Sequence, residues 1–68
     1  MTQENIIKAA QGTDCATFYR EHENALEWID IDNLSDFNEG MVNLLYRPTH
    51  GEPIALLFVN GEFAEWSY

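Results

Sequence analysis

Cys15 and His22 are the residues closest in type to a nucleophile and its general base. Nucleophilic catalysis needs two such groups within hydrogen-bonding distance of each other. They are seven positions apart in the sequence, so on one continuous helix they share a face but lie two turns, about 10 Å, apart along the axis. We therefore expect Cys15 to be a small buried hydrophobic residue and not a reactive thiol.

Metal ligands occur in the sequence, but without a complete spacing. Asp30, Asp32 and Asn33 alternate as the oxygen ligands of a calcium-binding loop do. The glycine and the terminal glutamate of that loop are replaced by Ser35 and Met41. Zinc would need paired Cys or clustered His, and neither is present. The sequence predicts no metal site and no cofactor.

Carboxylates are the most abundant chemical groups, with twelve Asp and Glu residues and a net charge of -9 in 68 residues. Carboxylate pairs catalyse glycoside hydrolysis in a deep cleft that shifts a pKa. So short a chain has little material for such a cleft, so we expect a non-enzymatic protein. Seven of the carboxylates, with no Lys or Arg between them, form what we call the acidic block: Glu21, Glu23, Glu27, Asp30, Asp32, Asp36 and Glu39.

The acidic block has two interpretations. In the first, it is a solvated surface that only keeps the protein soluble. In the second, its spaced carboxylates imitate the phosphates of a nucleic acid and complement a basic groove on another protein. Like charges at close spacing lower folding stability, so their number in a small domain favours the functional interpretation.

Aromatic residues add a second signal for binding. Trp28 lies inside the acidic block, and Trp66 and Tyr68 lie at the C-terminal end of the sequence. Trp and Tyr are enriched at binding hot spots, and a small domain cannot bury every large aromatic side chain. The predicted partner-binding residues are therefore these three aromatic residues and the seven carboxylates of the acidic block.

Composition disfavours several classes of protein. Direct nucleic-acid binding depends on Lys and Arg, and the chain has three in total. Negative charge disfavours anionic membranes, and the longest apolar run, residues 54–59, is far shorter than the roughly 20 residues of a membrane span. A single cysteine allows no internal disulfide, and residues 1–5 lack the features of a signal peptide. We expect one small acidic domain over residues 1–68 in the cytoplasm.

The first part of the chain is predicted to be helical. A first helix is expected from a cap at Thr2 to a stop at Gly12. A second helix is expected to begin after a cap at Thr13 or Asp14 and to run to about Asn24. The residues at helical spacing that predict its buried face are Cys15, Phe18, Tyr19, His22, Leu26 and Ile29.

Two short segments are harder to assign. Residues 25–31 either continue the second helix or form a strand with Glu27, Ile29 and Ile31 on one side. Residues 33–39 are expected to contain a short turn of helix, because a serine in this segment can serve as its cap. The assignment of the first segment decides whether the sheet has three strands or four.

The second part of the chain is predicted to be a three-stranded antiparallel meander over residues 41–47, 54–59 and 62–68. Asn60-Gly61 indicates a type I′ hairpin, since both central positions of that turn need a positive φ. The side chains expected in the core are those of Phe18, Leu56, Leu57, Phe58, Val59 and Phe63. The fold class is therefore α+β, with one or two N-terminal helices packed on a C-terminal three-stranded or four-stranded antiparallel β-meander.

The last predicted strand carries charged and aromatic residues on both faces. Phe63 is expected on one side, where Glu65 is also an option, and Glu62, Ala64, Trp66 and Tyr68 are expected on the other. An edge strand of this kind is suited to an interface.

In size and charge, though in no motif, the chain resembles the small acidic inhibitors encoded by bacteriophages and mobile elements. Some of these proteins block restriction enzymes, CRISPR complexes or host polymerase by occupying basic surfaces. The resemblance implies an anti-defence or host-takeover inhibitor, a nucleic-acid mimic that occupies the basic groove of a nuclease, CRISPR effector or polymerase. The alternative is a small accessory or regulatory subunit that associates through a sheet edge, also as a homodimer, with its acidity serving only solubility.

Overall fold

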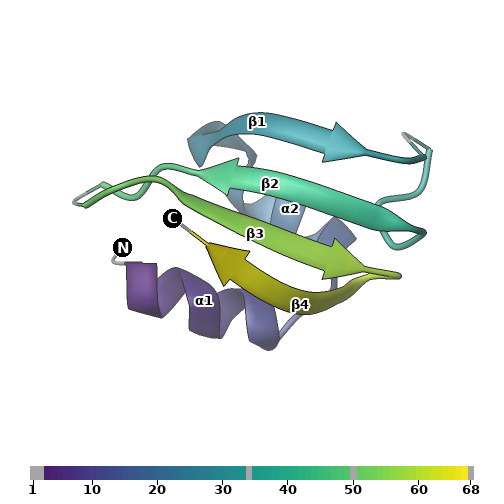
Figure 1. Ribbon diagram of the computed structural model, residues 1–68, viewed down its shortest axis with the longest axis horizontal. Helices are drawn as coiled ribbons and strands as arrows, with labels where there is room; N and C mark the ends of the chain where they lie inside the picture. The colour runs from purple at the N-terminus through teal and green to yellow at the C-terminus, as the bar shows by residue number, and fades with distance from the viewer. Residues whose placement is uncertain (1–2, 34, 50, 68) are drawn as a thin grey trace.

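Two helices pack on one side of a four-stranded antiparallel sheet (Figure 1). The computed structural model describes residues 3–33, 35–49 and 51–67. In chain order the elements are α1 (Gln3–Gln11), α2 (Cys15–His22), the 3-10 turn η1 (Glu23–Ala25), β1 (Leu26–Ile31), β2 (Met41–Tyr46), β3 (Ile54–Val59) and β4 (Glu62–Ser67). The strands lie in the order β1-β2-β3-β4. The predicted α+β meander is confirmed, with residues 26–31 as its fourth strand.

Both helices have charges that match their dipoles or caps. Glu4 lies in the first turn of α1 and Lys8 in its last turn, near the positive and negative ends of the dipole respectively. The predicted stop at Gly12 is confirmed, whereas the predicted cap at Thr2 lies outside the described residues. At α2 the cap is Asp14, whose Oδ1 accepts a hydrogen bond of 3.0 Å from the backbone N–H of Thr17. No helix in the described part of the chain is long and apolar enough to cross a membrane.

Helix α2 ends at His22, two residues earlier than expected. After the 3-10 turn, the chain pairs with β2, and Leu26 and Ile29 lie opposite Tyr46 and Leu44. The prediction that Leu26 and Ile29 continue the buried face of the helix is therefore wrong. Helical spacing and strand alternation both fit this short apolar segment, and pairing with a neighbouring strand decided between them.

A bulge in β1 changes which residues face the helices. The register with β2 shifts between Leu26 and Trp28, so Glu27 is an extra residue in the strand. Leu26, Ile29 and Ile31 consequently face the helices, whereas Glu27 lies with Trp28 on the other side. The expected alignment of Glu27 with the two isoleucines is wrong, because one inserted residue reverses the alternation.

A second bulge has the same effect in β4. Phe63 lies opposite Phe58 and Trp66 opposite Leu56, which leaves Ala64 as the extra residue of the strand. Both aromatic side chains therefore lie on the helix side of the sheet. The prediction that Trp66 lies across the strand from Phe63 is wrong, because strict alternation holds only without a bulge.

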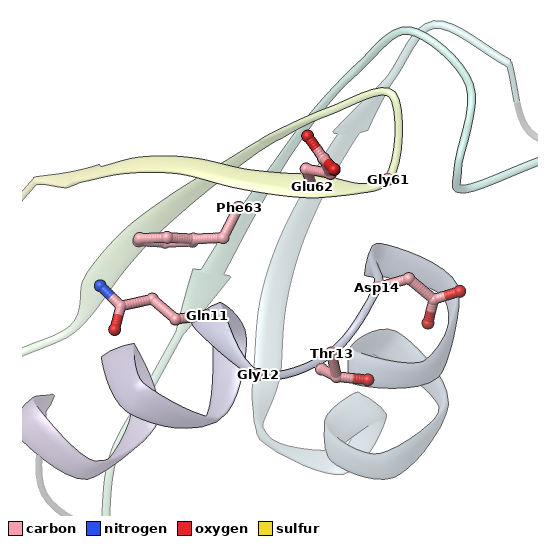
Figure 2. A pocket seen from close by; sticks show the side chains of 7 residues that line it. All are labelled: Gln11, Gly12, Thr13, Asp14, Gly61, Glu62 and Phe63. Carbon is pink, nitrogen blue, oxygen red and sulfur yellow. The ribbon is translucent and has the colours of Figure 1, made fainter.

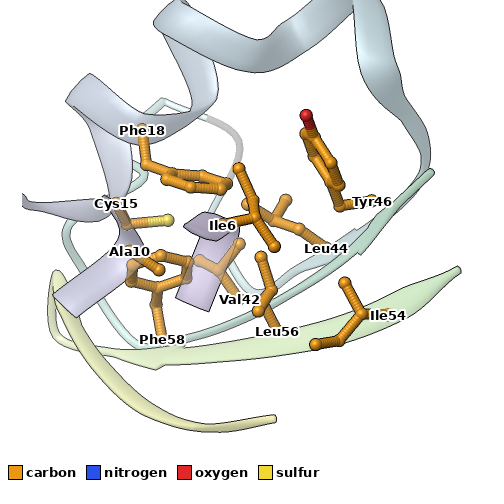
Figure 3. Packing of buried hydrophobic residues seen from close by; sticks show 10 residues of the cluster. All are labelled: Ile6, Ala10, Cys15, Phe18, Val42, Leu44, Tyr46, Ile54, Leu56 and Phe58. Atoms are coloured by element: carbon orange, nitrogen blue, oxygen red, sulfur yellow. The ribbon is translucent and has the colours of Figure 1, made fainter. Parts of the chain in front are cut away.

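The core lies between the helices and one face of the sheet (Figure 3). Its buried residues are Ile6, Ala10, Cys15, Phe18, Val42, Leu44, Tyr46, Ile54, Leu56 and Phe58. The expectation for Phe18, Leu56 and Phe58 is confirmed, and Phe63 packs against the cluster while partly buried. The expectation for Leu57 and Val59 is wrong, because alternate residues of a strand point to opposite faces and the helices cover one face. The chain is compact, with a Cα radius of gyration of 10.6 Å.

Residues 35–40 form turns, so the expected short helix is not present in this described segment. Asn33 Oδ1 accepts a hydrogen bond of 3.0 Å from the backbone N–H of Ser35, and Asp36 Oδ1 accepts one of 2.9 Å from that of Asn38. Side chains of this kind stabilise turns in competition with helix. The segment leads into β2 through Gly40, whose φ is +73°.

The β3–β4 hairpin and Asn38 meet at the beginning of α2. Asn60 and Gly61 have φ of +50° and +86°, which confirms the predicted turn signal. Asn38 Nδ2 donates to Asp14 Oδ2 at 2.8 Å, and Asn38 Oδ1 accepts from the backbone N–H of Ala16 at 3.0 Å. A Cβ on Gly61 would lie only 3.0 Å from Asn38. The hairpin and the helix therefore meet with no room for a side chain at Gly61.

Replacing Gly61 with Val is expected to lower the free energy of unfolding by at least about 2 kcal/mol, since a β-branched residue is strained at positive φ and its Cβ meets Asn38. Chemical denaturation measures the change. Gly12→Ala is the matched control, because its Cβ would make only ordinary contacts with the carbonyl oxygens of Lys8 and Ala9. Equal stability of Gly61→Val and the wild type would contradict the hairpin geometry.

Replacing Asp14 with Asn is expected to lower the melting temperature at pH 7. Hydrogen bonds from Thr17 and from Asn38 lower the pKa of Asp14. A carboxyl with a lowered folded pKa contributes stability above its unfolded pKa of about 3.9 and loses it as pH falls through the folded pKa. The difference in melting temperature between wild type and variant should therefore shrink below about pH 4. A difference that stays constant in thermal melts down to acid pH would refute this role for the Asp14 charge.

Candidate functional site

The face of the sheet opposite the helices is covered by no described part of the chain. Figure 1 looks onto this face, with α2 behind the sheet and no helix in front. We call its six apolar residues the open face: Trp28, Met41, Leu45, Ala55, Leu57 and Val59. Trp28 is 52% exposed and Met41 is 50% exposed. Contiguous apolar surface of this kind on a small protein indicates an interaction site.

Carboxylates border the open face on both edge strands. The sheet register places Asp30, Asn43, Leu57 and Glu65 in one row across the four strands. In the next row toward the β3–β4 hairpin, Glu62 lies opposite Val59. We call Asp30 of β1 and Glu62 and Glu65 of β4 the edge carboxylates. The apolar residues thus occupy mainly the central strands, and negative charge lies on either side of them.

Arg47 neutralises one carboxylate at the end of this surface. Its Nη2 donates to Glu27 Oε2 at 3.1 Å, and its Nε donates to the other oxygen of the same carboxylate. This pairing lowers the pKa of Glu27 and raises that of Arg47. Lys8 and Arg20 lie on the helices. Among the described residues, no Lys or Arg neutralises the edge carboxylates, because Arg47 is paired with Glu27 and the other two basic residues lie in the helices.

The structure divides the acidic block among three places. Glu21 and Glu23 are exposed at the end of α2 and in η1. Glu27 and Asp30 lie in β1 beside Trp28. In the β1–β2 connection, Asp32 accepts from the Met41 backbone at 3.1 Å, Asp36 from the Asn38 backbone at 2.9 Å and Glu39 from the Asn33 side chain at 3.2 Å. Three of the seven carboxylates therefore organise this connection.

Of the predicted aromatic contacts, the structure brings Trp28 to the open face. Trp66 is 42% exposed but lies on the helix side of β4, and Tyr68 lies outside the described residues. Sequence reasoning missed Glu62 and Glu65. The available signal was the apolar run of residues 54–59, which needs cover on both faces, together with the hairpin that places β4 beside it.

Cys15 and His22, the residues closest in type to a catalytic pair, both pack against residues of the core. Cys15 is fully buried, as predicted, and burial, followed by the nearby Asp14 charge, raises the pKa of its thiol to about 12. The ring of His22 lies 4.5 Å from that of Phe18 and 5.8 Å from that of Tyr46, measured between centroids. A protonated thiol is a poor nucleophile, so Cys15 serves packing.

A pocket of about 500 Å³ lies between the α1–α2 connection and the β3–β4 hairpin (Figure 2). Its lining consists of Gln11, Gly12, Thr13, Asp14, Gly61, Glu62 and Phe63. This lining contains no His, Cys, Lys or Arg, and Asp14 is engaged as the helix cap. Within the described ranges, no group of three or more His, Cys, Asp or Glu residues is placed to hold a metal ion. The open face is therefore the stronger candidate site.

The fold and this surface define a small α+β protein whose sheet has a helical layer on one side. No protein-family model matches the chain, and no curated protein or solved structure matches it significantly. The function is therefore inferred from the open face and its edge carboxylates.

Substituting Thr for Val on the two faces of the sheet tests which face is buried. Val42→Thr should cost about 1–3 kcal/mol, because it buries a hydroxyl in an apolar core. Val59→Thr should change stability by no more than about 0.5 kcal/mol, because Val59 is exposed on the open face. The two substitutions are chemically identical, so denaturation midpoints compare the sites directly. Similar losses at both positions would mean that the open face is covered within the protein itself.

Proposed function

We propose that this protein is a non-enzymatic inhibitor that occupies the basic, nucleic-acid-binding surface of a protein partner in the cytoplasm. The observation that supports this best is the open face, an exposed apolar centre between acidic edges. A nuclease, a CRISPR effector or a polymerase presents a basic groove of matching charge. An anti-defence or host-takeover role, which the resemblance to small acidic inhibitors implies, agrees with this choice of partner.

The two parts of the surface contribute differently to binding. Trp28 and Met41 expose large side chains, and aromatic anchors at the centre of an interface carry much of its binding energy. The edge carboxylates attract Lys and Arg, which raises the association rate and rejects partners of the wrong charge. The same field repels phosphates, so the protein competes with nucleic acid for a basic groove and does not bind nucleic acid itself.

The alternative, an accessory subunit that associates through a sheet edge, has less support. β1 contains a bulge at Glu27 and β4 contains one at Ala64. Bulges on edge strands interrupt the regular ladder that an added strand needs. A homodimer through the open face would bring together two chains of charge -9. The open face is thus a better docking surface for a basic partner than either edge is for a second strand.

Reversing charge at two matched places tests the proposal. Partners captured from a cell lysate at low salt are identified by mass spectrometry and assayed for nucleic-acid binding with and without the protein. The captured proteins should bind nucleic acid, and the wild-type protein should displace the nucleic acid from them. Asp30→Lys with Glu65→Lys should lose this competition by at least tenfold, while Glu21→Lys with Glu23→Lys, an equal charge change on the helix side, should retain most of it.

Two results would contradict the proposal. The first is capture only of proteins that bind no nucleic acid. The second is equal competition by the two charge-reversed variants, provided that thermal melts show both to be folded.

A further inference from the structure

We propose that the open face receives a basic amphipathic helix of the partner, about three turns long, lying along β2 and β3. This inference rests on the proposed function and adds the form of the partner's binding element. Its apolar side would meet Leu45, Leu57 and Val59, and Lys or Arg at its two flanks would meet the edge carboxylates.

The apolar pattern of the central strands supports a second layer on the sheet. β3 is apolar at every position from Ile54 to Val59, although α1 and α2 cover only one of its faces. Strands that are apolar on both faces are typical of sheets with a layer on each side. The described helices of the chain lie on the other face, so we assign the second layer to the bound partner.

The width of the surface fits a helix. Neighbouring strands are about 4.8 Å apart, so β1 and β4 lie about 14 Å from each other across three spacings. A helix with its side chains is about 10–12 Å across. Placed over β2 and β3, it would cover the apolar centre and leave Asp30 at one flank and Glu65 at the other. A partner sheet would instead extend over the edge carboxylates.

The length of the surface sets the length of the helix. Each strand has six residues, which extend over about 17 Å at 3.3 Å per step. A helix rises 1.5 Å per residue, so about 11 or 12 residues match the strand length. Apolar positions spaced i, i+3 or i+4, and i+7 on that helix would meet the rows at Val59, Leu57 and Leu45 in turn.

The charge of the surface decides between partners. The two helices of a second copy hold only Lys8 and Arg20 in the described chain against a total charge of -9. A second copy therefore lacks the two basic flanks that Asp30 and Glu65 require. A helix from a nucleic-acid-binding protein has such flanks, because it contacts phosphates with Lys and Arg.

Two synthetic peptides of equal composition test the inference. One is a 14-residue Leu/Lys peptide with leucines at i, i+3, i+4 and i+7 and lysines on both flanks, and the other is a scrambled peptide without an apolar side. The first should gain helical circular dichroism on binding and shift the NMR signals of Trp28, Leu45 and Leu57. The scrambled peptide should bind at least tenfold more weakly. Leu57→Thr with Val59→Thr, which leaves the charge unchanged and places β-branched residues that suit a strand, should weaken binding of the first peptide at least tenfold.

Controls distinguish this inference from the proposed function. Glu21→Gln with Glu23→Gln should leave binding of the first peptide unchanged. Equal binding of both peptides, insensitive to the Thr substitutions, would refute a helix on the open face but leave a charge-based binding function intact. The variant with Asp30→Lys and Glu65→Lys tests both proposals together. If it binds the peptide and the captured partner as well as the wild type does, the proposed function is refuted too. Thermal melts of each variant establish that it is folded.

Discussion

The N-terminus of α2 is the point that joins the two layers of the protein. Backbone N–H groups in the first turn of a helix have no partner within the helix and must find one elsewhere. At α2 they find three: Gly61 O accepts from Cys15 at 2.9 Å, Asn38 Oδ1 from Ala16 at 3.0 Å, and Asp14 Oδ1 from Thr17 at 3.0 Å. Two of these acceptors come from distant turns, so the helix is fully capped only when the sheet is formed.

The same turns also set the sheet itself. Asn60 donates its backbone N–H to Gly40 O at 2.9 Å, and Asn60 Oδ1 accepts the Gly40 N–H at 3.0 Å. This reciprocal pair fixes the hairpin against the beginning of β2. The two helices, of nine and eight residues, are then held on one face. Each helix is about 12 to 14 Å long and about 10 Å wide. Together the two helices are large enough to cover one face of a sheet of four six-residue strands, and they leave the opposite face of the sheet uncovered.

Local signals predicted much of this fold, and long-range pairing decided the rest. The Asn60-Gly61 turn, the apolar strand before it and the burial of Cys15 follow from residue types and alternation. The bulges at Glu27 and Ala64 do not, because each depends on the register with a partner strand. They changed the side of the sheet on which Glu27 and Trp66 lie, which is why alternation alone misplaced both.

The candidate site was predicted in part for the same reason. Trp28 and Asp30 were among the predicted binding residues, and they lie together because they are neighbours in β1. Glu62 and Glu65 were missed, since only the register of β3 with β4 brings them to the border of Leu57 and Val59. The hydrogen bond between Asn38 and Asp14, 24 positions apart, likewise could not be predicted from local sequence signals. Residue types predicted the chemical character of the surface, whereas the strand register determined which residues belong to it.

The two interpretations of the acidity are not exclusive on this surface. An exposed apolar face invites self-association, because burying it removes apolar area from water. Carboxylates on both edges of that face, in a chain of charge -9, oppose the approach of a second copy and so favour solubility. The same carboxylates attract a partner whose apolar surface is bordered by Lys and Arg. Under the proposed function, a charge that keeps copies apart would therefore also select the partner, and Trp28 and Met41 would stay exposed until a basic surface covers them.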